Sequence, residues 1–129
     1  MHSFNVKTGN REELIEITSQ VQNFISDSGK DDGICCVYTP HTTAAITINE
    51  NADPTVQKDI LKGLSHLKLE SVKYAHMEGN SPSHIKSSII GCSEMILVES
   101  GKLVLGTWQG IYFCEFDGPR TRKVMVQLV

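Results

Sequence analysis

Short runs of apolar and β-branched residues recur along this chain, and clusters of turn residues separate them. Two such runs, GIYFCEFDG and TRKVMVQLV, lie at the end of the sequence and meet at DGPR, a turn by composition. Just before them, EMILVES and GKLVLG flank Ser100 and Gly101, which predicts a hairpin. Strands joined by such short turns run antiparallel, so the pattern predicts a mainly antiparallel sheet.

Four further runs lie in the first half of the chain. HSFNVKT alternates apolar and polar residues, and EELIEIT extends the strand character. GICCVYT is nearly all apolar, which is typical of a strand buried on both faces. In AAITINE, the apolar residues share one face with Glu50. We expect GICCVYT and AAITINE to form a hairpin or to be neighbouring strands, with His41 in their connection.

Two segments have helical patterns instead. TSQVQNFISDSG places its apolar residues on one face, with Thr18 or Ser19 as a cap and Gly29 as a left-handed end. DPTVQKDILKGLSHL carries an apolar stripe behind Asp53, a good N-cap. HIKSSIIG fits a short helix or a strand. We therefore predict one α+β domain over residues 1–129, with two or three helices and a β-sandwich-like core.

Charge and hydropathy exclude some classes of protein. The 129 residues carry a formal charge of −3, and no Lys/Arg run indicates affinity for a nucleic acid backbone. No apolar run approaches the roughly 18–20 residues that a membrane helix needs, and the N-terminus lacks the apolar core of a signal peptide. We therefore expect a cytoplasmic protein that binds neither nucleic acid nor membrane.

The four cysteines, Cys35, Cys36, Cys92 and Cys114, lie among apolar residues and show no CxxC spacing. This arrangement favours buried, reduced thiols over a zinc-thiolate site or a disulfide framework.

Polar residues that surface solvation explains poorly gather first around the AAITINE strand. PHTT, before it, offers the imidazole of His41 and the hydroxyls of Thr42 and Thr43, and the alternative is a solvated hairpin loop. NENADP, after it, leads into a helix N-terminus, which favours anions unless Asp53 occupies that place as the cap.

Two more polar clusters lie further along the chain. In HMEGNSPSH, a backbone that folds back at the glycine and proline would bring His76, Glu78 and His84 together as a transition-metal set. The alternative is a loop with two exposed histidines. In GTWQGIYFCEFDGPR, Glu115 and Asp117 share one strand face, where they suit acid–base work, a divalent ion or simply solvent.

Together, the phrases HTTAAITINENADP, HMEGNSPSHIKSSIIG and GKLVLGTWQGIYFCEFDGPRTRKVMVQ closely resemble the YjbQ-type family, often labelled secondary thiamine-phosphate synthase. The resemblance covers nearly the whole chain. It implies a compact α+β fold, a homotrimer and a polar pocket built from the motif histidines and acids. The motif positions match His41, Glu50, Asn51, Asp53, His76, Asn80, His84, Trp108, Gln109 and Arg120.

The resemblance implies a transferase that joins a pyrimidine methyl diphosphate to a thiazole phosphate. We expect His41, Glu50 and Asp53 to be catalytic. The expected substrate-binding residues are Thr42, Thr43, Asn51, Asn80, Lys86, Trp108, Gln109 and Arg120. His41, His76 and His84 would hold zinc, and Glu50, Asn51 and Asp53 suit Mg²⁺.

Two other functions fit these residues: a metal-dependent hydrolase or lyase, with Glu50 or Glu78 as the general base, and a non-enzymatic module that binds a small phosphorylated ligand. One geometric expectation concerns all three. On a straight strand, His41 and Glu50 lie up to about 30 Å apart at 3.3 Å per residue. They would then share a pocket only across a subunit boundary of a homotrimer.

Overall fold

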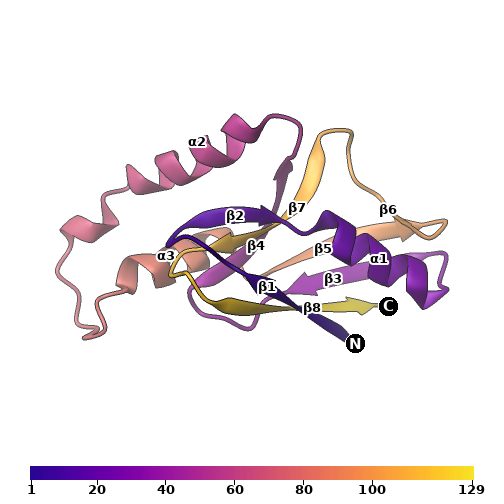
Figure 1. Cartoon of the computed structure of the whole chain (residues 1–129), viewed down its shortest axis with the longest axis horizontal. Coiled ribbons are helices and arrows are strands. Elements are labelled where there is room, and N and C mark those ends of the chain that lie inside the picture. Colours follow the sequence, from indigo (N-terminus) through magenta and orange to yellow (C-terminus); the bar gives the residue numbers. More distant parts are fainter.

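The strands form two antiparallel sheets that face each other across a common core in the computed structural model, which describes residues 1–129 (Figure 1). The larger sheet has the order β1 (His2–Lys7), β8 (Thr121–Leu128), β3 (Gly33–Tyr38), β5 (Ser93–Glu99) and β6 (Lys102–Leu103). The smaller sheet has the order β2 (Glu13–Glu16), β7 (Gln109–Glu115) and β4 (Ala44–Glu50). The predicted α+β class with a sandwich-like core is confirmed.

Alternation along β7 and β8 builds the core between the sheets. On β8, Val124 and Val126 face inward, and exposed or half-buried residues lie between them. On β7, Ile111 and Phe113 face the larger sheet and have no exposed surface. The opposite face of β7 is covered as well, where Cys114 packs beside Phe116, Ala45 and partly buried leucines of α2. β7 is therefore the central strand of the smaller sheet and is buried on both faces.

Three α-helices and a short 3₁₀ helix (Leu69–Ser71) complete the fold. Helix α1 (Thr18–Ser28) begins after Ile17 without a side-chain cap, so the predicted Thr18 or Ser19 cap is wrong. Its predicted end at Gly29 is confirmed by a left-handed φ of 72°. Helix α2 (Pro54–Ser65) is capped as predicted, because Asp53 Oδ1 accepts a hydrogen bond of 2.9 Å from the Thr55 N–H. In Figure 1, α2 extends away from the two sheets.

The third helix, α3 (Ser81–Ile90), settles the ambiguity of HIKSSIIG in favour of a helix. Its buried side chains are polar: Ser83, Lys86 and Ser87. The Ser83 hydroxyl donates to the Phe116 carbonyl and the Ser87 hydroxyl to the Ala44 carbonyl, both at 2.6 Å. These two bonds hold α3 against the end of β7 and the start of β4. A search for an apolar stripe along the helix does not predict them, because the buried side chains are polar.

Two expectations about β3 are wrong. β3 and β4 do not pair, because the connection at residues 39–43 carries the chain from the larger sheet to the smaller one, where β4 pairs with β7. Nor is β3 buried on both faces: Cys35 and Val37 point inward, but Ile34 and Tyr38 on the outer face remain 41% and 39% exposed. His41 does lie in the β3–β4 connection, as expected.

Of the remaining local predictions, one is confirmed and one is wrong. The β5–β6 hairpin is confirmed at Ser100 and Gly101, whose φ angles of 52° and 73° are positive. All four cysteines are free, but only Cys35 and Cys114 are buried. Cys36 is half-buried and Cys92 is exposed, so burial of all four is wrong. No helix has the length and apolar character needed to cross a membrane.

Candidate functional site

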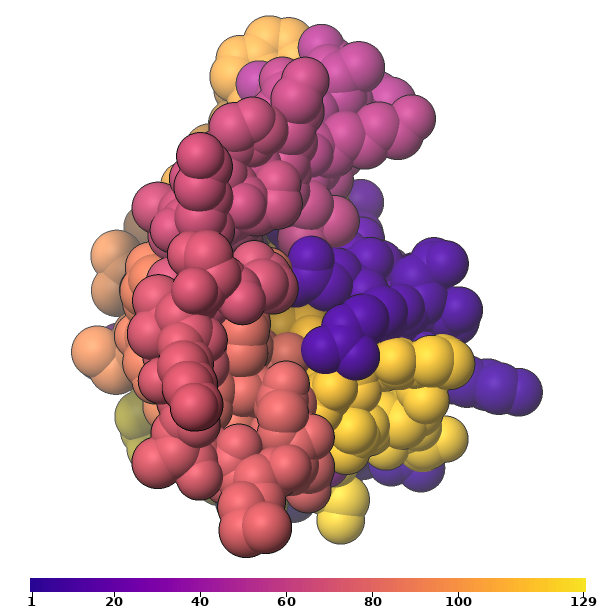
Figure 2. Space-filling view, turned by 90° about the vertical axis from the view of Figure 1, so that its left-hand side faces the viewer, coloured from indigo at the N-terminus to yellow at the C-terminus, as the bar shows by residue number.

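A pocket of about 390 Å³ opens where the β3–β4 connection, the segment before α3, α3 itself and the β7–β8 turn meet. In Figure 2, the segment before α3 borders the yellow β7–β8 region on the molecular surface. We call this the polar pocket, because none of its lining residues is hydrophobic. The lining residues are Pro40, His41, Thr42, Thr43, His76, Glu78, Asn80, His84, Asp117, Arg120 and Arg122.

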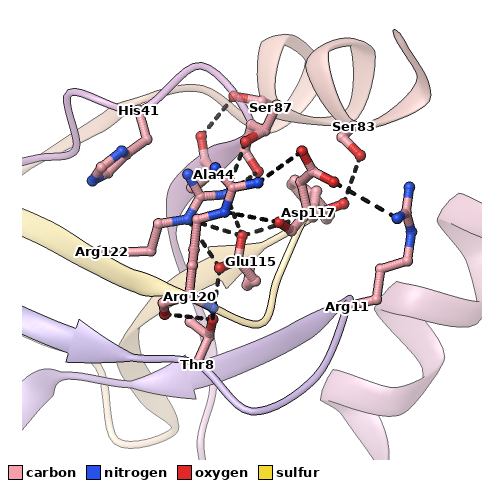
Figure 3. Close-up of polar contacts among 12 residues, drawn as sticks. Thr8, Arg11, His41, Ala44, Ser83, Ser87, Glu115, Asp117, Arg120 and Arg122 are labelled. Carbon is pink, nitrogen blue, oxygen red and sulfur yellow. Dashed lines mark hydrogen bonds and ion pairs between the residues drawn. The ribbon is translucent and has the colours of Figure 1, made fainter. Parts of the chain in front are cut away.

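A buried ion pair forms the floor of the polar pocket. Arg122 on β8 and Glu115 on β7 have side chains that are 2% and 0% exposed. Arg122 Nε donates to both Glu115 oxygens at 2.9 and 3.0 Å, and Nη2 donates to Glu115 Oε2 and to Thr43 Oγ1 (Figure 3). Arg122 Nη1 makes no hydrogen bond within the protein, although the residue lines the pocket. One cationic N–H donor group is therefore fixed in place and unused.

The Glu115 carboxylate is fully satisfied, which decides its charge. Besides Arg122, it accepts from the Thr8 hydroxyl at 2.7 Å and from the Asp117 N–H at 3.2 Å. Burial by itself raises the pKa of Glu115, but the hydrogen bonds from Arg122 and Thr8 outweigh it and lower the pKa below its ordinary value. Glu115 is thus a buried carboxylate that stays ionised, and solvent exposure of this strand face is excluded.

The β7–β8 turn is tied to the same network. The Thr8 hydroxyl, which donates to Glu115, accepts from the Arg120 N–H at 2.8 Å. A Cβ atom added to Gly118 would lie 2.9 Å from both Glu115 Cγ and Thr8 Oγ1, and closer still to the Asn10 carbonyl oxygen. No larger residue fits there, so the turn holds Asp117 and Arg120 in one place above the ion pair.

Asp117 collects three donors at the edge of the polar pocket. Its Oδ2 accepts from Asn80 Nδ2 at 2.9 Å and from Arg120 Nη2 at 3.1 Å. Arg11 Nη1 lies 3.7 Å from Oδ1. Arg120 is about half exposed and its Nη1 also makes no hydrogen bond within the protein. The negative charge of Asp117 is therefore compensated, and Arg120 retains donors for a ligand.

His41 is held as a neutral imidazole. Its Nε2 accepts a hydrogen bond of 2.9 Å from the Lys123 N–H, so the proton of the neutral ring is on Nδ1. Burial lowers the pKa of His41 below its ordinary value, and the positive charge of Arg122 lowers it further. A neutral His41 offers a ligand one N–H donor, and protonation would break the bond to Lys123.

The rings of His76 and His84 lie next to each other in the wall of the polar pocket, with ring centroids 5.5 Å apart and planes nearly perpendicular. Neither ring makes a hydrogen bond to the protein among those found. As arranged, however, the residues do not fit the predicted zinc site. No three or more His, Cys, Asp or Glu side chains are grouped to hold a metal ion, and Nε2 of His41 is already engaged. Metal binding stays a prediction.

The structure separates the predicted site residues into two groups. His41, Thr42, Thr43, His76, Asn80, His84 and Arg120 line the polar pocket. Glu50, Asn51, Asp53, Trp108 and Gln109 lie at the other end of β4 and β7, where Asp53 caps α2 and Asn51 donates to Glu16. Within one chain the acids predicted to be catalytic, or to bind Mg²⁺, therefore do not meet the histidines.

Lys86 also lies outside the polar pocket. Its side chain is 3% exposed, and Nζ lies 2.7 Å from Glu12 Oε2 and 3.5 Å from Glu70 Oε1. Lys86 thus forms an ion pair that anchors α3, and its expected contact with a substrate phosphate stays a prediction.

The sequence indicated Glu115 as a candidate site residue, but its pairing with Arg122 was not predicted. Arg122 lies on the inward face of β8 at a period of two with Val124 and Val126, and Glu115 keeps the same period with Ile111 and Phe113. A charged residue in register with a buried face needs a partner. Two such residues of opposite charge, on strands joined by one turn, predict a buried ion pair between the strands.

A family model described as UPF0047 protein YjbQ-like matches residues 2–129. A UPF0047 protein of Methanocaldococcus jannaschii is 53% identical over 100% of this chain and 94% of its own. The UPF0047 protein YugU of Bacillus subtilis is 49% identical over 100% and 98%. The crystal structure of an uncharacterized conserved YjbQ/UPF0047 family protein from Clostridium acetobutylicum has a TM-score of 0.97 and 52% identity over both full chains.

Replacing Glu115 by alanine should lower the free energy of unfolding by about 3–5 kcal/mol, because it leaves Arg122 charged, buried and unpaired. The exposed β5 residue Glu99 is the matched control, and Glu99→Ala should change stability by less than about 0.5 kcal/mol. Urea unfolding measures both. The double variant Glu115→Ala/Arg122→Met should recover part of the loss. Equal effects of Glu115→Ala and Glu99→Ala would contradict the role of the pair.

His41 gives the protein a predictable pH dependence. Its pKa is lower in the folded than in the unfolded chain, where it is about 6.5. As the pH falls below that value, the unfolded chain takes up the proton first. The contribution of His41 is therefore complete above about pH 6.5 and is lost below it. Urea unfolding at pH 7.5 and pH 5 should show a smaller loss on acidification for His41→Gln than for the wild type. An equal or larger loss in the variant would show that His41 is not the group responsible.

Proposed function

Because this chain belongs to the UPF0047 YjbQ-like family and shares its fold over the full length, we propose a function from the polar pocket: it binds a small phosphorylated metabolite. The observation that carries this proposal is the pair of arginines. Arg120 and Arg122 both line the pocket, and each has an Nη1 group without an acceptor in the protein. Guanidinium groups bind phosphate oxygens through charged, directional hydrogen bonds.

The remaining lining supports the same class of ligand. Neutral His41 presents Nδ1–H, and the Thr42 side chain at the pocket wall carries a free hydroxyl. Asp117 on the pocket wall and Glu115 beneath it are already compensated by Arg120 and Arg122, and Glu78 accepts a hydrogen bond of 2.6 Å from Asn80 Nδ2. A phosphate thus meets donors that are fixed in advance, which reduces the entropy lost on binding.

We further propose that the bound metabolite reacts in a transfer of the thiamine-phosphate synthase kind, the reaction implied by the sequence resemblance. His84, whose ring makes no hydrogen bond within the protein, has both nitrogens available for proton transfer. His41 would stabilise the departing diphosphate as a neutral donor. No observation favours the metal-dependent hydrolase, because the three histidines are not arranged as a ligand set.

Phosphate binding can be measured without knowing the physiological substrate. In an NMR titration at pH 7.5, methyl phosphate should bind saturably, with shifts confined to the polar pocket. Arg120→Gln should weaken binding roughly tenfold, since a charged hydrogen bond is lost. Lys102→Gln, on β6, is the control and should bind as the wild type does. Absence of saturable binding would refute the proposed ligand class.

The transfer reaction is tested separately with both substrates and Mg²⁺. Thiamine phosphate should form, and His84→Gln should slow its formation by a factor of about 10² or more. Failure of the wild type to form product would refute the transfer while leaving phosphate binding intact.

We propose that the second group of motif residues acts from a neighbouring subunit of a homotrimer. β4 spans seven residues, or roughly 20 Å, between the pocket and Glu50. The outer face of the larger sheet is apolar at its far end, where Ile34, Leu97 and Val104 are 41%, 62% and 49% exposed. A second copy of this chain that covers that face would form the subunit boundary of the homotrimer, and Trp108, in the second group, is itself 62% exposed. The four free thiols fit a reducing compartment, and we propose the cytoplasm.

Sedimentation equilibrium tests the assembly. The wild type should sediment as a trimer at micromolar concentration. Leu97→Glu should produce monomers, because burying an unpaired carboxylate in the interface is unfavourable. Gln20→Glu, at an exposed position of α1 away from that face, is the control and should remain trimeric. A monomeric wild type that forms thiamine phosphate at full rate would refute the shared pocket.

A further inference from the structure

A second cavity of about 580 Å³ adjoins the polar pocket on the side of β3 and β5. Its lining residues are Tyr38, Thr39, Pro40, His41, Thr42, His84, Ser87, Ser88, Gly91 and Cys92. Four of these, Pro40, His41, Thr42 and His84, also line the polar pocket. The two spaces therefore lie side by side between the β3–β4 connection and α3, with these four residues in the wall of both, and we call them together the groove.

The two halves of this groove differ in charge. The polar pocket contains two arginines and two carboxylates, Glu78 and Asp117. The second cavity contains no Lys, Arg, Asp or Glu, and its walls are hydroxyls, backbone, the side chain of Tyr38, the imidazoles of His41 and His84 and the thiol of Cys92. Tyr38 is 39% exposed and its hydroxyl makes no hydrogen bond within the protein. A charged group is thus recognised at one end, and an uncharged one is accommodated at the other.

We propose that the whole groove binds one ligand: a phosphate ester of a flat, uncharged ring, with the phosphate at Arg120 and Arg122 and the ring against Tyr38. The inference rests on the proposed phosphate binding and adds the organic part of the ligand. A ring stacked on an aromatic face loses water and gains a favourable quadrupole contact. Thr42 and Tyr38 offer hydroxyls to polar atoms at the edge of the ring.

The position of the two histidines follows from this placement. His41 and His84 are on opposite walls and line both halves of the groove. The atoms that connect phosphate and ring must therefore pass between His41, a neutral imidazole that donates through Nδ1, and His84, whose two ring nitrogens make no hydrogen bond within the protein. This is where a bond to the phosphate-bearing group would be made or broken.

A third cavity competes for the ring. It has a volume of about 390 Å³ and is lined by Tyr74, His76, Ser81, His84 and Ile85. It shares only His76 and His84 with the polar pocket, and does not reach His41. The Tyr74 hydroxyl is also engaged, since it donates to the Leu69 carbonyl at 2.7 Å. The second cavity is larger and shares more of its wall, so we assign the ring to it.

NMR titrations with phenyl phosphate and methyl phosphate test the proposal. Phenyl phosphate should bind the wild type roughly fivefold to tenfold more tightly than methyl phosphate. Tyr38→Ala should remove this preference and leave the affinity for methyl phosphate within about twofold. Tyr38→Phe, which keeps the ring, should retain it. Tyr74→Ala is the matched control and should behave as the wild type.

The outcomes separate this inference from the proposed function. If methyl phosphate does not bind, phosphate binding itself fails. If both esters bind with equal affinity, phosphate binding stands and the ring site is overturned. If Tyr74→Ala removes the preference and Tyr38→Ala does not, the ring occupies the third cavity and the assignment is wrong.

A measurement on the wild type guards against misfolding of the variants. Cys92 is exposed and lines the second cavity, whereas burial raises the pKa of Cys35 to about 11 and of Cys114 to about 12. Iodoacetamide should therefore alkylate Cys92, as identified by peptide mapping. Saturating phenyl phosphate should slow that reaction several-fold, and saturating methyl phosphate should not. Equal rates with the two esters would overturn the placement of the ring.

Discussion

The buried pair of Arg122 and Glu115 is the interaction on which the rest of the site depends. Two charges removed from water are unfavourable unless hydrogen bonds satisfy them, and here Thr8, Thr43 and the Asp117 N–H complete the set. These three partners come from three separate segments of the chain. Since β7 belongs to one sheet and β8 to the other, the pair also links the two layers at the edge where the core ends.

The same pair prepares the polar pocket for a ligand. Glu115 fixes one edge of the Arg122 guanidinium and leaves Nη1 without an acceptor in the protein, so this donor would require no reorganisation to bind the proposed phosphate. The Thr8 hydroxyl connects the pair to the backbone of Arg120, and the space around Gly118 admits no side chain. The stability of the fold and the geometry of the site thus rest on one network. Few substitutions in the turn would alter one without the other.

The sequence predicted the fold class and most elements because alternation and turn composition are local properties. Strands such as β7 and β8 follow from a period of two, and α2 from Asp53 and an apolar stripe. The features that the sequence did not predict depend on contacts between segments that are distant along the chain. β3 and β4 look like hairpin strands until their connection crosses between sheets. Lys86 resembles a phosphate contact until α3 turns it toward Glu12. For the site, motif resemblance named residues at both ends of β4, and the length of a straight strand already predicted that His41 and Glu50 lie far apart within one chain.

The histidines show how this environment can divide chemical roles between identical side chains. His41 lies beside Arg122, and its Nε2 accepts from the Lys123 N–H, so positive charge and hydrogen bonding both keep it neutral. A neutral imidazole whose acceptor is occupied cannot take a proton from a substrate, but it can donate through Nδ1. His84 has neither restraint and lines the same groove from the opposite wall. In the proposed reaction, an acid–base role therefore suits His84, and charge stabilisation suits His41. The prominence of His41 in its motif, by itself, suggests the reverse assignment.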